Sequence, residues 1–406
     1  MARWFTAFFI LSAFSACTLP ANAAPIARAA VSPSGELIVA ETVIDGVPML
    51  TVLPFKKSGV APRLFSLSGQ RVTLLSWADS GHALVFTEQV GPGEMRGRDR
   101  AAAEALRTGG SEGAKLDIDR MKFTSLYALN VESMRAVQML GAERGLAFTS
   151  RLDDVVAVDG NEILMRAPIW LSHGTVRQSY LVGSSFYGGQ PIRDTVELPE
   201  CILGIPALWR VSLQSGNGER VGNPELTTAS WLAAQASAAY RLDRANEGYR
   251  LTRTGGRGSV SVPIPVDRRL RPLGVRSDGV TAEVMVYRGE NPERVVRISL
   301  TTGAVTEHEA TAAGLRVQSI IRDERSGLVD GWYDAGRVVW IDPKRLAHQE
   351  MLVEAFTGAG VEIVSSSSDG DRDLFRVVRP TGGEWYSFDA IAKHAELLGA
   401  EAVIAQ

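Results

Sequence analysis

The side chains best suited to catalysis or metal binding are five histidines, and their spacing limits the chemistry open to them. They are His82, His173, His308, His348 and His394. Metal sites gather His and Cys ligands at short, regular spacing, and no two of these histidines lie that close. We therefore expect each histidine to face solvent or to be satisfied by a hydrogen bond in the core.

Three aspartates at alternate positions form a second candidate. Asp369, Asp371 and Asp373 resemble the opening of a calcium-binding loop. Such a loop needs a glycine after the third aspartate and a carboxylate further on, where this chain has Leu374 and Pro380. We favour a hairpin turn, with the three side chains on one strand face beside it.

The third candidate is a thiol. Cys201 lies in the apolar run 198–203, with no histidine nearby. A reactive cysteine needs surroundings that stabilise its thiolate, so we interpret Cys201 as a buried structural thiol.

The first 23 residues are typical of a secretory signal peptide. Arg3 precedes an apolar run that ends near Leu19, and the small residues Ala21-Asn22-Ala23 suit signal peptidase. Cleavage after Ala23 predicts a periplasmic or secreted chain in which Cys201 has no disulfide partner. The run is too short to span a membrane, and we expect no membrane span after it.

A lipoprotein is the alternative for this segment. Phe14-Ser15-Ala16-Cys17 resembles a lipobox in which Phe14 stands where Leu is usual. Cys17 would then be the anchored residue.

The composition excludes one large class of partner. The chain has 406 residues, 45% of them hydrophobic, and a net charge of -3. Nucleic-acid binding needs a dense basic surface, so we expect no nucleic-acid partner.

A series of hairpins must position these side chains. A Ser/Asp-Gly turn followed by an apolar strand occurs at 31–39, 76–86 and 366–377. Strands followed by polar turns recur at 126–131, 208–213, 295–300 and 385–389. Alternate apolar residues in these strands indicate sheets that pack on neighbouring sheets.

Pairing the hairpins predicts an all-β fold, a β-propeller. The units are 27–70, 71–140, 152–222, 227–262, 273–310, 316–355 and 361–399. Each is near the roughly 40–50 residues of a propeller blade. We predict one domain over 24–406 with seven four-stranded antiparallel blades, with six or eight as alternatives.

Three segments depart from the repeat. Insertions are predicted near 91–122, with a short helix at 98–107, and near 172–200. A helix at 341–356, with Pro343 near its start, could replace part of a strand pair in the sixth unit. Little chain precedes the first unit, so we do not expect a donated strand to close the ring.

Tryptophan recurs about once per unit. We expect these side chains to wedge between adjacent sheets, with a stacking platform for carbohydrate or peptide as the alternative. The residues are Trp77, Trp170, Trp209, Trp231, Trp332, Trp340 and Trp385.

The whole pattern resembles the N-terminal propeller of the prolyl oligopeptidase family, serine peptidases with an α/β-hydrolase domain after a β-propeller. The last unit carries the most specific resemblance, at 344–348, 355–358, 361–365, Asp369-Gly370 and 384–389. In that family the propeller restricts access to the catalytic serine and helps to select substrates. TolB-like propellers share the Ser-x-Asp-Gly turns.

The catalytic residues of that family have no counterparts here. Its hydrolase domain needs a Gly-x-Ser-x-Gly elbow, and the nearest match, 183–187, has Tyr187 in place of the second glycine. Glu104 and Glu112 are too far apart to match the paired glutamates of dipeptidyl-peptidase relatives. The sequence therefore predicts no catalytic, cofactor-binding or metal-binding residue, and no hydrolase domain before Gln406.

These observations predict a non-catalytic, secreted propeller that binds or scaffolds a peptide or protein. One alternative is the propeller half of a split or truncated serine peptidase, whose partner is a separate α/β-hydrolase chain. Another is a TolB-like envelope interaction protein. A lyase or lactonase site on the propeller axis would need acidic or histidine ligands around a metal, and we find no such ring in the sequence.

Overall fold

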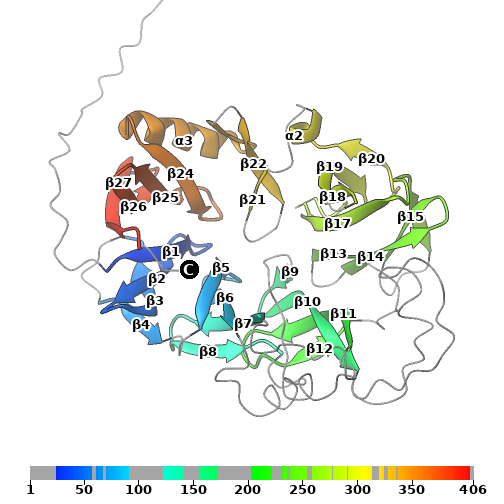
Figure 1. Ribbon diagram of the computed structural model, residues 1–406, viewed down its shortest axis with the longest axis horizontal. Coiled ribbons are helices and arrows are strands. Elements are labelled where there is room, and N and C mark those ends of the chain that lie inside the picture. The colour runs from blue at the N-terminus through cyan, green and yellow to red at the C-terminus, as the bar shows by residue number, and fades with distance from the viewer. Residues whose placement is uncertain are drawn as a thin grey trace, which may run out of the picture.

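Seven antiparallel sheets follow one another along the chain and form a ring (Figure 1). This computed structural model describes residues 24–402 apart from 57–60, 67–69, 91–121, 141–154, 172–202, 222–229, 236–237, 254–257, 277, 290, 313–319, 324–327 and 335–336. Within these residues, six sheets have four strands and one has three. The predicted seven-bladed propeller is confirmed.

The strands of each blade are consecutive in the chain, and the first strand of each blade lies toward the axis (Figure 1). Blade 1 contains β1 (Ile26–Val31), β2 (Leu37–Ile44), β3 (Val47–Pro54) and β4 (Arg63–Ser66). Blade 2 contains β5 (Arg71–Trp77), β6 (His82–Val90), β7 (Lys122–Asn130) and β8 (Arg135–Gln138). Blade 3 contains β9 (Val155–Asp159), β10 (Glu162–Leu171), β11 (Leu203–Ser212) and β12 (Gly218–Arg220). Blade 4 contains β13 (Ser230–Gln235), β14 (Ala238–Ala245), β15 (Gly248–Arg253) and β16 (Ser259–Val262).

The remaining blades continue the same order. Blade 5 contains β17 (Arg268–Val275), β18 (Thr281–Arg288), β19 (Asn291–Ser299) and β20 (Val305–Glu307), and α2 (Glu309–Ala312) follows it. Blade 6 contains β21 (Ile320–Arg322), β22 (Val329–Asp334) and β23 (Arg337–Trp340), followed by α3 (Pro343–Ala355). Blade 7 contains β24 (Gly360–Ser366), β25 (Arg372–Arg379), β26 (Gly382–Asp389) and β27 (His394–Ala400).

Blade 5 begins earlier than the sequence indicated. The predicted unit started at 273, whereas β17 starts at Arg268. Three of the first four residues of β17 are arginines, so this part of the strand lacks the apolar signal by which the other strands were recognised.

The predicted Ser/Asp-Gly turns join the first two strands of several blades. In the turns of blades 1 and 7 the glycine N–H donates to a carbonyl three residues earlier, from Gly35 to Ser32 and from Gly370 to Ser367. These glycines have φ angles of 72° and 66°, which L side chains adopt only with strain. In blade 2 the Asp79 side chain also accepts the Gly81 N–H, at 2.6 Å. Because these hydrogen bonds join residues only two or three positions apart, the turns can be recognised from the sequence.

Two of the predicted tryptophans fill seams on either side of blade 1. Trp77 of blade 2 is 2% exposed and packs in one apolar cluster with Ala30 and Val39 of blade 1. Trp385 of blade 7 is 3% exposed and packs with Ile38 of blade 1. A large ring therefore covers the apolar face that each sheet cannot bury alone.

Two further tryptophans lie in the same kind of cluster. Trp340 packs with Leu352 of α3 and Phe375 of blade 7, and Trp209 is half-buried beside the cluster of blades 2 and 3. The side chains of Trp170 and Trp231 lie outside the described residues.

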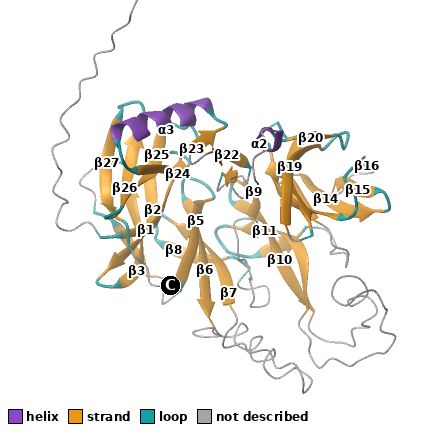
Figure 2. Cartoon of the chain, turned by 45° about the horizontal axis from the view of Figure 1, so that its top comes forward, coloured by secondary structure: helices purple, strands orange, loops and turns teal. Residues whose placement is uncertain are grey.

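Blade 6 differs from the prediction of four strands per blade, because it has three and continues into α3. The Asp342 side chain caps this helix by accepting the Lys344 N–H at 3.0 Å, and Pro343 occupies the first turn. These two residues start a helix where a fourth strand would run. In Figure 2, α3 lies along one end of the blade 7 sheet and beside β22 and β23.

In the described part of the chain, the ring closes without an exchanged strand. All four strands of blade 7 come from the C-terminal part of the chain, and β1 opens blade 1. Ile26 forms a parallel bridge with Glu401, and the Ala402 N–H donates to the Ile26 carbonyl at 2.8 Å. Backbone hydrogen bonds therefore join the first blade to the last.

Several predictions fall outside the described residues. They concern the signal peptide at 1–23 with Cys17, most of the insertion at 91–122, the insertion at 172–200, and Cys201. Those statements stay predictions. No helix in the described part of the chain is long and apolar enough to cross a bilayer.

Replacing the tryptophan at the closing seam should weaken the whole ring. We expect Trp385→Ala to lower the free energy of unfolding by about 3–5 kcal/mol, because it leaves a cavity between blades 7 and 1. The exposed Ile391, which is 78% accessible, provides the control. Ile391→Ala should change stability by less than about 0.5 kcal/mol in urea unfolding. Equal losses for the two variants would show that the seam is not a major source of stability.

Candidate functional site

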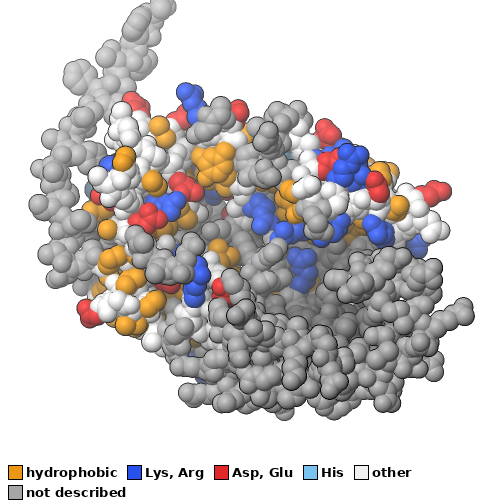
Figure 3. All heavy atoms as spheres, in the orientation of Figure 1, with side chains coloured by type: hydrophobic (Ala, Val, Ile, Leu, Met, Phe, Trp, Pro, Cys, Tyr) orange, Lys and Arg blue, Asp and Glu red, His pale blue; other side chains and the backbone are white. Residues whose placement is uncertain are grey.

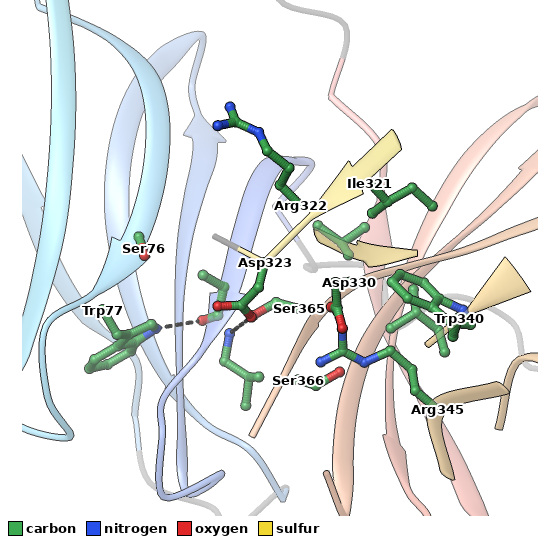
Figure 4. A pocket seen from close by; sticks show the side chains of 14 residues that line it. Ser76, Trp77, Ile321, Arg322, Asp323, Asp330, Trp340, Arg345, Ser365 and Ser366 are labelled. Atoms are coloured by element: carbon green, nitrogen blue, oxygen red, sulfur yellow. Dashed lines mark hydrogen bonds and ion pairs between the residues drawn. The ribbon is translucent and has the colours of Figure 1, made fainter. Parts of the chain in front are cut away.

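A small polar cavity lies where the first strands of four blades meet beside the axis (Figure 4). Its walls come from β1, β5, β21 and β24, with additional side chains from β22, β23 and α3. These segments are far apart in the sequence, so only the closed ring brings them together.

Two side chains in this wall satisfy backbone groups of β1, the edge strand of its sheet. The Trp77 indole N–H donates to the Ala30 carbonyl at 3.1 Å, and Ser365 Oγ accepts the Val31 N–H at 3.1 Å. Both bonds are drawn in Figure 4. Neighbouring blades therefore cover an edge that would otherwise be open to pairing with another chain.

A second part of the wall is an ion pair. Arg345 of α3 pairs with Asp330 of β22, and the Arg345 guanidinium lies over the Trp340 ring, 4.9 Å from its centroid. Both charged side chains are less than one fifth exposed, at 15% and 18%. The pair fixes α3 against blade 6 and leaves Trp340 as a flat wall of the cavity.

Arg322 and Asp323 bring opposite charges to the end of β21. In Figure 4, Arg322 extends away from the other labelled side chains, whereas Asp323 points toward Ser365. Burial lowers the pKa of the Arg322 guanidinium, and nearby Tyr287 acts in the opposite direction. An arginine stays charged even so, because its ordinary pKa is far above neutrality.

The cavity itself is too small for a peptide. It holds about 40 Å³, and one buried water needs on the order of 10–15 Å³. The space therefore suits a few water molecules. A larger ligand would have to lie outside it, toward the axis, with the cavity side chains beneath.

A serine, an aspartate and a histidine meet close to this wall. Ser366 Oγ donates to Asp373 Oδ1 at 2.5 Å, and His348 Nδ1 lies 2.7 Å from Asp373 Oδ2. A catalytic serine needs its hydroxyl hydrogen-bonded to the imidazole, but here the carboxylate lies between the two. The arrangement ties α3 to β24 and β25 and does not activate Ser366.

The predicted position of the three aspartates is wrong in one respect. They do not share a strand face, because β25 begins only at Arg372. Asp369 and Asp371 lie in the turn, where Asp369 Oδ1 accepts the Asp371 N–H at 3.0 Å and Lys344 reaches Asp371. Asp373 is 1% exposed and faces the core. The turn interpretation itself is confirmed.

His308 belongs to a buried ionic cluster. Its Nε2 lies 3.5 Å from Glu283 Oε1, and both residues are 0% exposed. Arg276 donates to the same carboxylate at 2.9 Å, and the Val329 N–H of blade 6 donates to Glu283 Oε2 at 2.8 Å. Glu283 therefore holds blade 5 to blade 6.

The pKa of Glu283 is set by opposing effects. Burial alone would raise it, but the nearby His308 imidazole, the hydrogen bond from the Val329 N–H and the Arg276 guanidinium bring the pKa below its ordinary value. The carboxylate is thus the form that this cluster stabilises.

The other described histidines are placed as expected. His82 Nδ1 lies 3.0 Å from Asp79 Oδ2, and its Nε2 lies 3.3 Å from Asn130 Nδ2. His394 is exposed in β27, and His173 lies outside the described residues. In the part of the chain that the structure describes, no three His, Cys, Asp or Glu side chains are grouped to hold a metal ion.

Sequence analysis did not find the residues of the cavity wall. Arg322, Asp323, Asp330 and Arg345 belong to no local motif, and Ser365 lies in an ordinary strand. Arg345 and Ser365 do lie in the segments 344–348 and 361–365 that carry the family resemblance, but no contact between these segments was predicted.

No family model matches this sequence, and no curated protein matches it either. Among solved structures, acylaminoacyl peptidase of Pyrococcus horikoshii is similar over 92% of this chain and 44% of its own, at 11% identity and a TM-score of 0.39. TolB from Acinetobacter baumannii is similar over 93% of this chain and 65% of its own, at 11% identity and a TM-score of 0.32.

A separate propeller domain is also similar. It is that of the Trilobed protease from Pyrococcus furiosus, with 93% of this chain and 86% of that one covered, at 10% identity and a TM-score of 0.33. Structures of prolyl oligopeptidase-family peptidases, which the sequence resembles, are thus among the neighbours of this chain. The chain spans less than half the length of the acylaminoacyl peptidase.

The Glu283 cluster should make stability depend on pH. Because folding lowers the pKa of Glu283, its contribution is present above its ordinary value of 4.5 and is lost as the pH falls through the lower folded value. We expect Glu283→Gln to be less stable than the parent at pH 7, with the difference shrinking in acid.

Urea unfolding at several pH values between 7 and about 3 measures this difference. The exposed Glu350 of α3 gives a matched control, and Glu350→Gln should leave the pH profile unchanged. A constant gap between parent and Glu283→Gln at all pH values would contradict the assignment.

Proposed function

We propose that this chain is a non-catalytic binding propeller whose ligand is a peptide or a peptide segment of a protein, held at the axis beside the polar cavity. The observation that carries the proposal is the convergence of polar side chains from four blades at the inner ends of the sheets. A propeller presents such a surface where loops and first strands face the channel, and ligands commonly bind there.

The chemistry of the wall suits a peptide. It offers the hydroxyls of Ser76, Ser365 and Ser366, the carboxylate of Asp323 and the guanidinium of Arg322. Peptide groups present one donor and one acceptor per residue, and a peptide chain also carries charged ends. A mixed wall of donors and acceptors can satisfy such groups, whereas an apolar wall would leave them without partners.

The non-catalytic part of the proposal is supported by the Ser366–Asp373–His348 contacts. Proton transfer from a catalytic serine needs a direct hydrogen bond between its hydroxyl and the imidazole. Here Asp373 lies between the Ser366 hydroxyl and the His348 imidazole. We also propose a periplasmic or secreted location, as the N-terminal segment predicts.

Selection from a phage-displayed library of random heptapeptides tests the binding role. We expect enriched sequences that bind the purified chain, and we expect Asp323→Asn to weaken them about 10-fold by removing a charged partner. The exposed Asp334 of β22 gives the matched control, since Asp334→Asn removes the same charge on the same blade. No enrichment over a blank surface would overturn the binding role.

Activity is tested on the same preparation. Chromogenic peptide and ester substrates should show no turnover above buffer. Turnover that a serine-directed inhibitor abolishes would overturn the non-catalytic reading.

A further inference from the structure

The sequence contains one asparagine that is followed by glycine, Asn217-Gly218, and the pair lies at the turn between β11 and β12. The backbone of this turn is held in place, because the Asn217 carbonyl accepts the Ser212 N–H at 3.0 Å and the Asn217 N–H donates to Ser215 Oγ at 3.3 Å. The Asn217 side chain is exposed, and within the described ranges its amide group has no hydrogen-bond partner. This amide is therefore free to turn toward the backbone.

The N–H of the following glycine has no partner in the sheet. In an antiparallel ladder, hydrogen-bonded pairs alternate with pairs that make no bond to each other. The Ser212 N–H bonds to the Asn217 carbonyl, so the next pair along the ladder makes none. That pair is Val211 with Gly218. The Gly218 N–H therefore points away from β11, and no acceptor for it lies in the described segments.

We propose that Asn217 undergoes spontaneous deamidation by attack of the next backbone nitrogen. The Gly218 nitrogen gives up its proton and bonds to Cγ of Asn217, the bond from Cγ to the side-chain nitrogen breaks, and that nitrogen leaves as ammonia with the displaced proton. Water then opens the five-membered imide ring. Addition at one carbonyl gives aspartate, and addition at the other gives isoaspartate, in which the main chain runs through the former side chain. Glycine favours the attack, because it has no Cβ to obstruct the approach and its backbone is the least restricted.

The other asparagines are less suited to this reaction, since none of them is followed by glycine. Asn130 gives the clearest contrast. Its Oδ1 accepts the Ser133 N–H at 2.9 Å, and the N–H of the following Val131 already donates to a backbone carbonyl. The branched Cβ of Val131 also restricts the approach. Asn291 precedes a proline, which has no N–H. We therefore expect deamidation to concentrate at one position.

The turn that contains this position lies against blade 2. The Leu140 N–H donates to the Gly216 carbonyl at 2.7 Å, and Leu140 is buried in one apolar cluster with Val211. A Cβ at Gly216 would clash with the Gln138 carbonyl. A Cβ at Gly218 would clash with the Leu140 side chain. Isoaspartate adds one carbon atom to the main chain within this closely packed segment, so we expect it to loosen the seam between blades 2 and 3.

The polar cavity lies in another part of the ring. Its described lining residues come from blades 1, 2, 6 and 7, whereas β12 is the outermost strand of blade 3. The Lys and Arg side chains that Figure 3 shows beside the central hollow are also in another region, near β17 and β21. Solvent ions screen a carboxylate that forms on the outer side of the ring. Deamidation is thus expected to alter one seam and to leave the proposed binding surface unchanged.

Ageing of the purified native chain tests the inference. Samples are kept in mildly alkaline buffer at physiological temperature, digested with trypsin at mildly acidic pH and compared by mass spectrometry with an unaged sample. The tryptic peptides 211–220 and 123–135 each contain a single asparagine, Asn217 and Asn130 respectively. We expect the conversion of amide to acid to be about 10-fold faster in 211–220 than in the control peptide. Equal conversion in the two peptides would overturn the proposal.

Two variants test the effect on the seam. Asn217→Gln keeps an exposed amide but would have to form a six-membered ring, so peptide 211–220 of this variant should show no conversion. After ageing, the parent should unfold at a lower urea concentration than before, whereas Asn217→Gln should keep its midpoint. Asn217→Asp supplies the charge without the longer main chain, and before ageing it should unfold at the midpoint of the unaged parent.

Each measurement decides a separate step. If the parent is modified and yet unfolds after ageing at the same urea concentration as before, the effect on the seam is wrong. If unaged Asn217→Asp unfolds as early as the aged parent, the charge weakens the seam and the isoaspartate explanation is wrong. The comparison of the two peptides needs no variant and no ligand. Neither a variant that fails to fold nor a failure of the proposed binding role would therefore remove the test.

Discussion

The seam between the first and last blades is the constraint on which the rest of the structure depends. Each sheet buries its two faces only against its neighbours, so an open ring would expose one face of blade 1 and one of blade 7. Backbone hydrogen bonds join Ile26 of blade 1 to the segment at Glu401 and Ala402, which follows blade 7, and Trp385 packs across this seam. Since no strand is exchanged among residues 24–402 as described, packing and a few backbone hydrogen bonds hold this seam, and no continuous sheet crosses it.

Closure of the ring also creates the candidate site. The first strands of the blades are held side by side at the axis, and the cavity lies where β1, β5, β21 and β24 meet. Its polar groups already have structural partners, such as Ser365 with the Val31 N–H and Arg345 with Asp330. Groups fixed in this way lose little freedom when a ligand arrives, which is the general advantage of preorganisation.

The sequence predicted those features that depend on near neighbours in the chain. A Ser/Asp-Gly turn is a local structure, so the blades and their order could be read from residues such as Gly35 and Gly370. The packing of Trp77 between two blades was predicted because a tryptophan recurs about once per repeat unit. The sequence did not predict the contact of His348 with Asp373, because it depends on how α3 sits on blade 7. The start of β17 was missed for a related reason, since Arg269 is placed by its partner Tyr287 and carries no apolar signal.

Among the described residues of blade 6, a helix follows the third strand where the other blades have a fourth strand. In its place, α3 is held by Lys344 to the turn of blade 7, by Arg345 to β22 and by His348 to β25. Buried or half-buried pairs of this kind add little net stability compared with apolar packing, but they fix geometry. They therefore fix α3 between blade 6 and blade 7. Because Arg345 of this helix pairs with Asp330 and lies over the Trp340 ring, the same helix also holds one side of the cavity wall in place.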